Sequence, residues 1–167
     1  ITEAGFLSFG TQTLIQRKIP MAKPNPANTT HSISDADLVS VLAQIGAEID
    51  HQPLRSSALA RVMRETFHGS DASGAWDWRM AYDLMQAAAI QVLLRGDGAA
   101  GDIAAAKLLA SRLLTETRRS EQQIRLQQFS TPLAFATMAV RAAAIRKGET
   151  VLEPSAGTGA LAAFAAR

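Results

Sequence analysis

The segment Val151–Gly159 constrains the fold more than any other part of the 167 residues. It begins with apolar residues, ends in a turn that contains Gly157 and Gly159, and is followed by an alanine-rich stretch. This pattern predicts a buried strand over residues 150–153, a tight turn, and a helix over residues 160–167. Glycines let the main chain pass close to a ligand, and a helix start presents free N–H groups. The order strand, glycine turn, helix is typical of cofactor-binding α/β domains.

Upstream of this segment, apolar residues recur at helical spacing between stretches rich in turn-forming residues. The pattern predicts helices over residues 35–50, 55–67, 76–95, 102–128 and 131–145. Ser34 is expected to cap the first helix and Thr131 the last, with Pro132 at the first helical position, where its missing N–H costs nothing. The helix over residues 76–95 is apolar around most of its girth, so we expect it at the centre of a bundle. Near Thr117 the fourth helix turns polar and basic, and we expect it to break or to emerge into solvent there.

The predicted fold class is therefore mainly α, in two parts. A helical region covers residues 34–121, and the first helix-strand-helix of an α/β unit covers residues 127–167. The single predicted strand has no partner strand in the sequence, although its N–H and C=O groups need one. We therefore expect residues 150–167 either to be poorly ordered or to pack on the helices as an irregular segment.

Composition excludes several classes of protein. There are no cysteines, which rules out disulfides and thiolate metal sites and indicates a reducing, cytoplasmic setting. No apolar run reaches the roughly 18 residues of a membrane span. The three histidines are far apart in the chain, and none has a partner at helical spacing, so no metal site is predicted: His31, His51 and His68.

The amino-terminal residues show no sustained period. The chain starts with Ile1, whereas Met21 begins a stretch that looks like an ordinary protein start. We expect Met21 to be the initiator and residues 1–20 to be upstream or added sequence, with a flexible native terminus as the alternative. Residues 1–33 as a whole are expected to be a disordered or non-native leader.

Two short motifs are more specific in combination than each is alone. The hexapeptide Gln127–Pro132, taken alone, predicts a capped helix start with Phe129 as a hydrophobic staple. The segment Glu153–Gly159 is not a phosphate loop, because no Gly-Lys-Ser/Thr follows it. A Phe-x-Thr-Pro helix start that leads into a strand ending Glu-Pro-x-Ala-Gly-x-Gly resembles the amino-group DNA methyltransferases that use S-adenosylmethionine.

This resemblance implies roles for both motifs. The glycine turn would wrap the methionine part of the cofactor, and the acidic residue that closes the strand would help to hold its amino group. The Thr-Pro motif would close over the carboxylate end. The cofactor-binding residues implied by the resemblance are Phe129, Thr131, Pro132, Glu153, Pro154, Ala156, Gly157 and Gly159.

A second resemblance covers residues 57–167. The stretches Phe67–Trp78, Arg118–Glu121 and Gln127–Pro132 look like bacterial strawberry-notch-like proteins. These are large, often plasmid-encoded chains described as methylase/helicase, in which a helical region and a methyltransferase-like domain precede a helicase-type ATPase. The resemblance implies that residues 127–167 begin a Rossmann-like α/β methyltransferase domain, here truncated, and that the chain is an amino-terminal fragment of a longer protein.

The departures from the methyltransferase pattern limit what these residues can do. An enzyme of this kind needs an acidic residue after its second strand for the cofactor ribose, and an Asn/Asp-Pro-Pro-aromatic motif for the target amino group. Neither lies within the 167 residues. No catalytic residue is assigned, and we expect the chain itself to be inactive. The full-length parent would bind S-adenosylmethionine and act on an adenine-type amino group of DNA.

Charge is unevenly distributed along the chain. Residues 107–147 hold eight basic and two acidic side chains, whereas the net charge of the whole chain is only +2. Such a basic stripe, through Arg118, Arg119 and Arg125, is suited to DNA phosphates. A solvated helix face explains the same stripe without any partner. A non-enzymatic helical module that binds nucleic acid or protein is therefore the alternative function.

The entrance of the predicted helix 76–95 is unusually aromatic. Trp76 and Trp78 flank Asp77 and are expected to pack in the bundle. Asp71 and Asp77 are expected to cap this helix rather than to act as a carboxylate pair.

Overall fold

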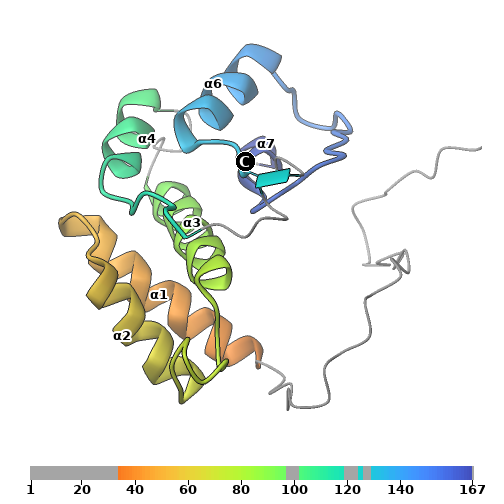
Figure 1. Ribbon diagram of the computed structural model, residues 1–167. Helices are drawn as coiled ribbons and strands as arrows, with labels where there is room; N and C mark the ends of the chain where they lie inside the picture. Colours follow the sequence, from red (N-terminus) through yellow and green to blue (C-terminus); the bar gives the residue numbers. More distant parts are fainter. Residues whose placement is uncertain (1–33, 97–101, 119–123, 126–128, 167) are drawn as a thin grey trace, which may run out of the picture. The chain divides into compact units, whose positions relative to one another are not determined.

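The computed structural model describes residues 34–96, 102–118, 124–125 and 129–166, all within the unit Ser32–Arg167 (Figure 1). The mainly α class is confirmed, because helices account for all the regular secondary structure in this described part. The helices are α1 (Asp35–His51), α2 (Ser56–Phe67), α3 (Trp78–Arg95), α4 (Ile103–Ala110), α6 (Leu133–Ala143) and α7 (Ala160–Ala165). The predicted leader over residues 1–33 lies outside the described residues.

Helix α1 begins where its sequence predicts. The Ser34 hydroxyl accepts a hydrogen bond from the Asp37 N–H at 3.1 Å, and an Asp37 carboxylate oxygen accepts one from the Ser34 N–H at 3.3 Å. This capping box satisfies the main-chain donors that open the helix. One face of α1 then buries Val41, Ile45 and Ile49 completely.

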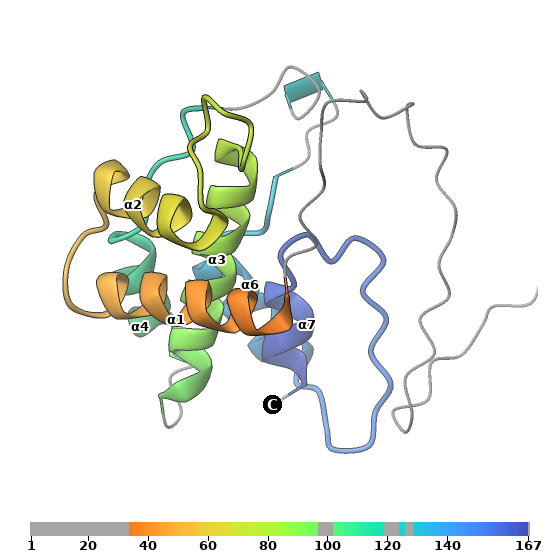
Figure 2. The same ribbon diagram turned by 90° about the horizontal axis from the view of Figure 1, so that it is seen from below.

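Helix α3 is the central helix of the described unit. It packs against α1, α2, α4 and α7, and in Figure 1 it lies between the α1–α2 pair and the group α4, α6 and α7. The 90° view shows α1 crossing α3 (Figure 2). The buried residues of α3 lie around most of the helix, as the sequence predicts: Ala81, Tyr82, Met85, Ala88, Ala89, Ile90 and Leu93. Asp77 caps it by accepting from the Met80 N–H at 2.7 Å, so α3 starts two residues later than predicted.

Helix α4 ends at Ala110, whereas a helix to residue 128 was predicted. The reason is tertiary: the Arg112 guanidinium donates to the Ile49 carbonyl at 3.2 Å and also to the Asp50 carbonyl. The Arg112 carbonyl in turn accepts the Leu54 N–H at 2.8 Å. These contacts turn the chain back onto the end of α1, so the predicted helix is wrong over residues 111–118.

Helices α6 and α7 carry the carboxyl-terminal part of the described chain. Pro132, not Thr131, is the N-cap residue of α6, and no side chain caps this helix. The prediction of Thr131 as the cap is therefore wrong by one residue, within the usual variation of helix ends. Helix α7 confirms the predicted final helix over residues 160–165, and packs against α3 and α6 with Ala160 and Phe164 buried.

Residues 150–153 form no strand. Val151 is 43% exposed and Leu152 is 81% exposed, so the prediction of a buried strand is wrong for the chain as described. A strand needs a neighbour for its N–H and C=O groups, and no described residues supply one. Residues 150–159 form an irregular and largely exposed segment, whereas residues 160–165 of the segment expected to be irregular form helix α7. The Rossmann-like sheet has no counterpart in the described structure.

Among the helices described, none combines the length and the apolar character that crossing a membrane requires.

Candidate functional site

The glycine turn has a main-chain conformation that only glycine adopts readily. Gly157 and Gly159 have φ angles of +55° and +87°, in the left-handed region. The Gly159 N–H closes the turn by donating to the Ala156 carbonyl at 2.7 Å. Gly159 then serves as the N-cap residue of α7, and its own carbonyl accepts the Ala163 N–H at 2.8 Å. The turn is therefore well defined although no strand precedes it.

The structure brings the two sequence motifs into contact. A Cβ atom built on Gly157 would lie 3.6 Å from the Ser130 Oγ and 3.8 Å from the Ser130 Cα. Ser130 is the residue between Phe129 and Thr131, so the Phe-x-Thr-Pro segment lies against the glycine turn. Sequence alone specifies no distance between these motifs, and the contact arises because α6 packs against α7.

Glu153 is held by its own segment. Its Oε1 accepts from the Ser155 N–H at 3.0 Å and is 3.5 Å from the Ser155 hydroxyl. The half-buried carboxylate therefore faces the start of the turn. Of the other residues implied in cofactor binding, Gly159 is half-buried, and the following are exposed: Phe129, Thr131, Pro132, Pro154, Ala156 and Gly157. All eight thus remain accessible in the described structure.

A hydrogen-bonded chain of three side chains joins the glycine turn to the helical region. The Thr158 hydroxyl donates to the Gln86 Oε1 at 3.1 Å, and the Gln86 Nε2 donates to the Glu116 Oε1. Gln86 lies in the middle of α3, and Glu116 lies in the extended stretch after α4. No motif marks Gln86 or Glu116, so sequence reasoning missed both.

An additional carboxylate lies near this chain of side chains. Partial burial raises the pKa of Asp83 above its ordinary value. The Arg79 guanidinium opposes this shift, whereas the negative charges of Glu116 and Asp77 add to it. Asp83 and Arg79 form an ion pair one helical turn apart at 4.0 Å, with both side chains about half exposed.

Arg118 and Arg112 of the basic stripe have identified partners within the chain. The Arg118 guanidinium lies 4.3 Å from the centre of the Trp78 ring and 3.7 Å from an Asp71 carboxylate oxygen. Arg112 donates to the carbonyls at the end of α1. Arg125 is exposed, and Arg119 lies outside the described residues. The Arg118 side chain nevertheless stays 60% exposed.

The aromatic entrance of α3 is organised by the loop before it. Asp77 caps α3 as predicted, whereas Asp71 does not cap it but accepts from the Trp78 Nε1 at 2.9 Å. Trp76 is buried and donates from its Nε1 to the Gly69 carbonyl at 2.9 Å. The predicted packing of both tryptophans in the bundle is confirmed, since both belong to the core or pack against it.

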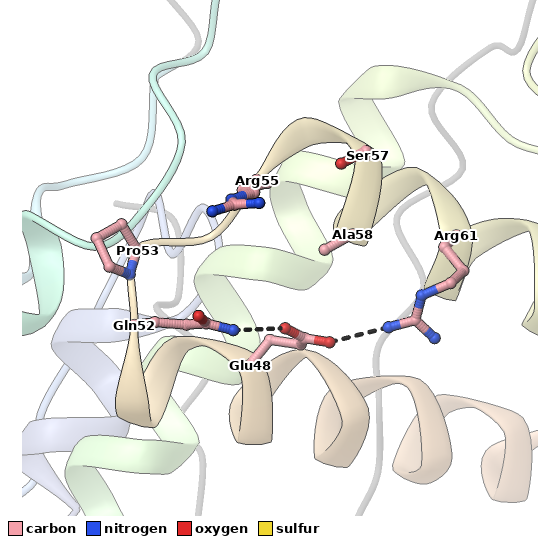
Figure 3. Close-up of a pocket in the computed structure, with 7 residues that line it drawn as sticks. All are labelled: Glu48, Gln52, Pro53, Arg55, Ser57, Ala58 and Arg61. Carbon is pink, nitrogen blue, oxygen red and sulfur yellow. Dashed lines mark hydrogen bonds and ion pairs between the residues drawn. The ribbon is translucent and has the colours of Figure 1, made fainter.

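A surface pocket of about 380 Å³ lies elsewhere, between the end of α1 and the start of α2 (Figure 3). Glu48 lines it and accepts hydrogen bonds from Arg61 at 2.9 Å and from Gln52 at 3.4 Å. None of the eight motif residues lines it. No group of three or more metal-binding side chains occurs among the residues for which the structure gives positions.

Comparisons with protein-family models, with curated proteins and with solved structures gave no match for this chain.

Proposed function

We propose that residues 129–159 form the cofactor side of an S-adenosylmethionine-dependent methyltransferase-like protein that acts on amino groups of DNA bases. The observation that carries this proposal is the close approach of Gly157 to Ser130. The methyltransferase pattern requires its Thr-Pro and glycine motifs to face one cofactor, and here they lie side by side. The strawberry-notch-like resemblance is part of the same proposal, with a helicase-type ATPase in the full-length parent.

The chemistry of the segment suits a cofactor with an amino acid end. The glycine turn exposes main chain without side chains in the way, which allows close approach. The Glu153 carboxylate at the start of the turn is suited to an ammonium group. Phe129, Thr131 and Pro132 would cover the carboxylate end of the methionine part, and Pro154 and Ala156 would shape the turn. Residues 150–153 would become the first strand of a Rossmann-like sheet once neighbouring strands pair with them.

The chain itself should transfer no methyl group. Its 167 residues contain no Asn/Asp-Pro-Pro-aromatic sequence that would hold a target amino group. With only part of the pocket present, we expect a dissociation constant weaker than about 1 mM, equivalent to less than about 4 kcal/mol of binding free energy.

A titration followed by NMR tests the proposal. Adding millimolar S-adenosylmethionine to the ¹⁵N-labelled chain should shift the amide signals of residues 129–131 and 153–159 and leave those of α1 and α2 unchanged. Gly157→Leu should abolish these shifts for two reasons. The leucine side chain would contact Ser130, and the main chain at position 157 would be held in a φ that is unfavourable for leucine.

Gly148→Leu is the matched control. Gly148 also has a positive φ, +91°, but has open space around its Cβ position, so leucine there causes backbone strain outside the site without a contact to Ser130. Ligand-induced shifts should survive in this variant. Unchanged amides at residues 129–131 and 153–159, or shifts that persist in Gly157→Leu, would contradict the proposal. Binding much tighter than about 1 mM would show that the cofactor pocket is more complete than proposed.

A non-enzymatic helical interaction module is the second candidate. It is favoured by the fact that none of the eight motif residues belongs to the buried core, which is built mainly by α1, α2 and α3. Under this alternative, the chain binds DNA or a protein partner in the same way with and without Gly157→Leu. Anisotropy measurements with labelled duplex DNA at low salt, on the parent and on Gly157→Leu, test this alternative. DNA binding in both, together with no response to S-adenosylmethionine in the NMR titration, would favour the interaction module.

A further inference from the structure

We propose that Gln86 of α3 is a positioning residue for the glycine turn, and that Glu116 fixes the orientation of its amide. The helical region would then be part of the site rather than only its support. The link between Gln86 and the turn is independent of what the turn binds. The further claim that this link affects the binding of S-adenosylmethionine rests on the proposed function.

The three side chains come from distant parts of the sequence and meet in one place. Thr158 lies between the two left-handed glycines, so a hydrogen bond that holds its side chain also restrains the turn. Its hydroxyl donates to Gln86 at 3.1 Å, and Gln86 donates to Glu116. All three side chains are half-buried, where a lost hydrogen bond is less readily replaced by water.

The chemistry of Glu116 and Thr158 determines which group donates in each of the two hydrogen bonds. An ionised carboxylate only accepts hydrogen bonds, so Glu116 must receive the NH₂ group of the Gln86 amide. This places the Gln86 carbonyl oxygen toward Thr158, whose hydroxyl is therefore required to donate. A carboxylate that holds an amide in this way stabilises one of its two flipped orientations. Glu116 thus acts on the turn through Gln86.

Helix α3 is well suited to transmit such a constraint. It is the helix that packs against α1, α2, α4 and α7, so the position of Gln86 is fixed by the main core. The glycine turn has no strand behind it in the described structure. The hydrogen bond from Thr158 to Gln86 of α3 therefore restrains the turn, as pairing with neighbouring strands would otherwise do.

The test uses hydrogen exchange of the Gly159 amide, whose bond to the Ala156 carbonyl closes the turn. Gln86→Leu keeps a side chain of similar size and removes both hydrogen bonds. It should speed exchange of this amide about five- to tenfold, the factor expected for one hydrogen bond, and shift the Thr158 signals. The Gly74 amide, which bonds to Asp71 in a different loop, is the internal control and should be unaffected.

A charge exchange distinguishes positioning from general stability. Gln86→Glu alone places two carboxylates face to face and should loosen the turn as much as Gln86→Leu does. Adding Glu116→Gln restores the pattern with reversed roles, because the carboxylate now at position 86 would accept both from the amide at position 116 and from the Thr158 hydroxyl. The double variant should therefore recover slow exchange at Gly159. Gln91→Leu is the matched control, since Gln91 lies on the same helix and bonds only Arg95 among the contacts described.

Each possible result either supports or contradicts the inference about Gln86. Exchange at Gly159 that stays within twofold of the parent in Gln86→Leu, or a folded double variant that does not recover, would overturn the inference. An equal effect from Gln91→Leu would overturn it as well. Loosening in Gln86→Leu with recovery in the double variant supports it, whether or not the parent chain responds to S-adenosylmethionine. In the proteins where the turn is loosened, weaker ligand-induced shifts would extend the role of Gln86 to the cofactor.

Discussion

Among the residues that the structure describes, Asp83 is the one whose pKa the fold clearly shifts. Its folded-state pKa is raised, chiefly by partial burial, with further contributions from the charges of Glu116 and Asp77 and opposition from Arg79. A carboxyl group with a raised folded-state pKa favours the folded state when protonated. That contribution is fully present below the ordinary pKa of an aspartate and is lost as pH rises through the raised value.

Asp83→Asn should therefore stabilise the chain at neutral pH. The gain in urea midpoint should be small, since the side chain is about half exposed and its pair with Arg79 is lost. The difference between the variant and the parent should disappear as pH falls toward 3, below the ordinary aspartate value of about 3.9. Urea titrations at several pH values measure this. A gain that grows on acidification would reverse the sign and contradict the burial argument.

Sequence reasoning at this scale found the residues that act locally and missed those that act across the fold. Ser34 and Asp77 cap their helices as predicted, because a cap depends on neighbours two or three positions away. Gly157 and Gly159 adopt the left-handed conformations that their turn requires. Gln86 and Glu116 carry no local signal, since their roles depend on which surfaces of distant segments meet.

Among the helices, the end of α1 shows how one side chain can set where other elements stop. Arg112 donates to the last carbonyls of α1, and its own carbonyl binds the Leu54 N–H just before α2. Carbonyl groups at a helix end need partners outside the helix. The helix periodicity that predicted a long α4 carries no information about this contact, and this is why that prediction failed.

Arg112→Ala should lower the free energy of unfolding by about 1–3 kcal/mol, because it leaves the carbonyl of the buried residue Ile49, and the more exposed carbonyl of Asp50, without their donor. Arg125→Ala is the matched control, since Arg125 is exposed, and should change stability by less than about 0.5 kcal/mol. Urea denaturation followed by far-UV circular dichroism compares the two. Similar small effects from both variants would show that the Arg112 contacts do not hold the end of α1.

The predicted strand fails for a related reason. Val151 and Leu152 have the composition of a buried strand, but a strand forms only when another strand pairs with it. Composition specifies what a segment prefers, whereas pairing depends on residues elsewhere. The helix that follows needs no such partner for its own hydrogen bonds, so α7 forms while the strand does not.

For the described unit as a whole, the buried apolar residues form one continuous cluster. It includes residues of α1, α2 and α3 together with Leu109 of α4, Leu133 of α6 and Phe164 of α7. Helix α3 joins the two groups, because it packs against helices of both. Mutation of a buried residue of α3 should therefore destabilise both groups of helices together.

Met85→Ala tests this cooperativity. Met85 is 1% exposed, and removing its side chain should lower the free energy of unfolding by about 2–5 kcal/mol. Amide signals of Ile45 in α1 and Ala136 in α6 should disappear at the same urea concentration, in the parent and in the variant. Separate midpoints for these two probes would show that the groups on either side of α3 unfold independently.

The aromatic entrance of α3 also determines how the protein interacts with light. The chain has two tryptophans and one tyrosine, and all three meet there, with ring centres 5.5 Å apart for Trp76 and Trp78 and 5.7 Å apart for Trp78 and Tyr82. Nearly all absorption at wavelengths near 280 nm therefore arises from one corner of the molecule. Tryptophan emission comes from the same corner, so loosening of the contacts there should change the emission spectrum without any added dye.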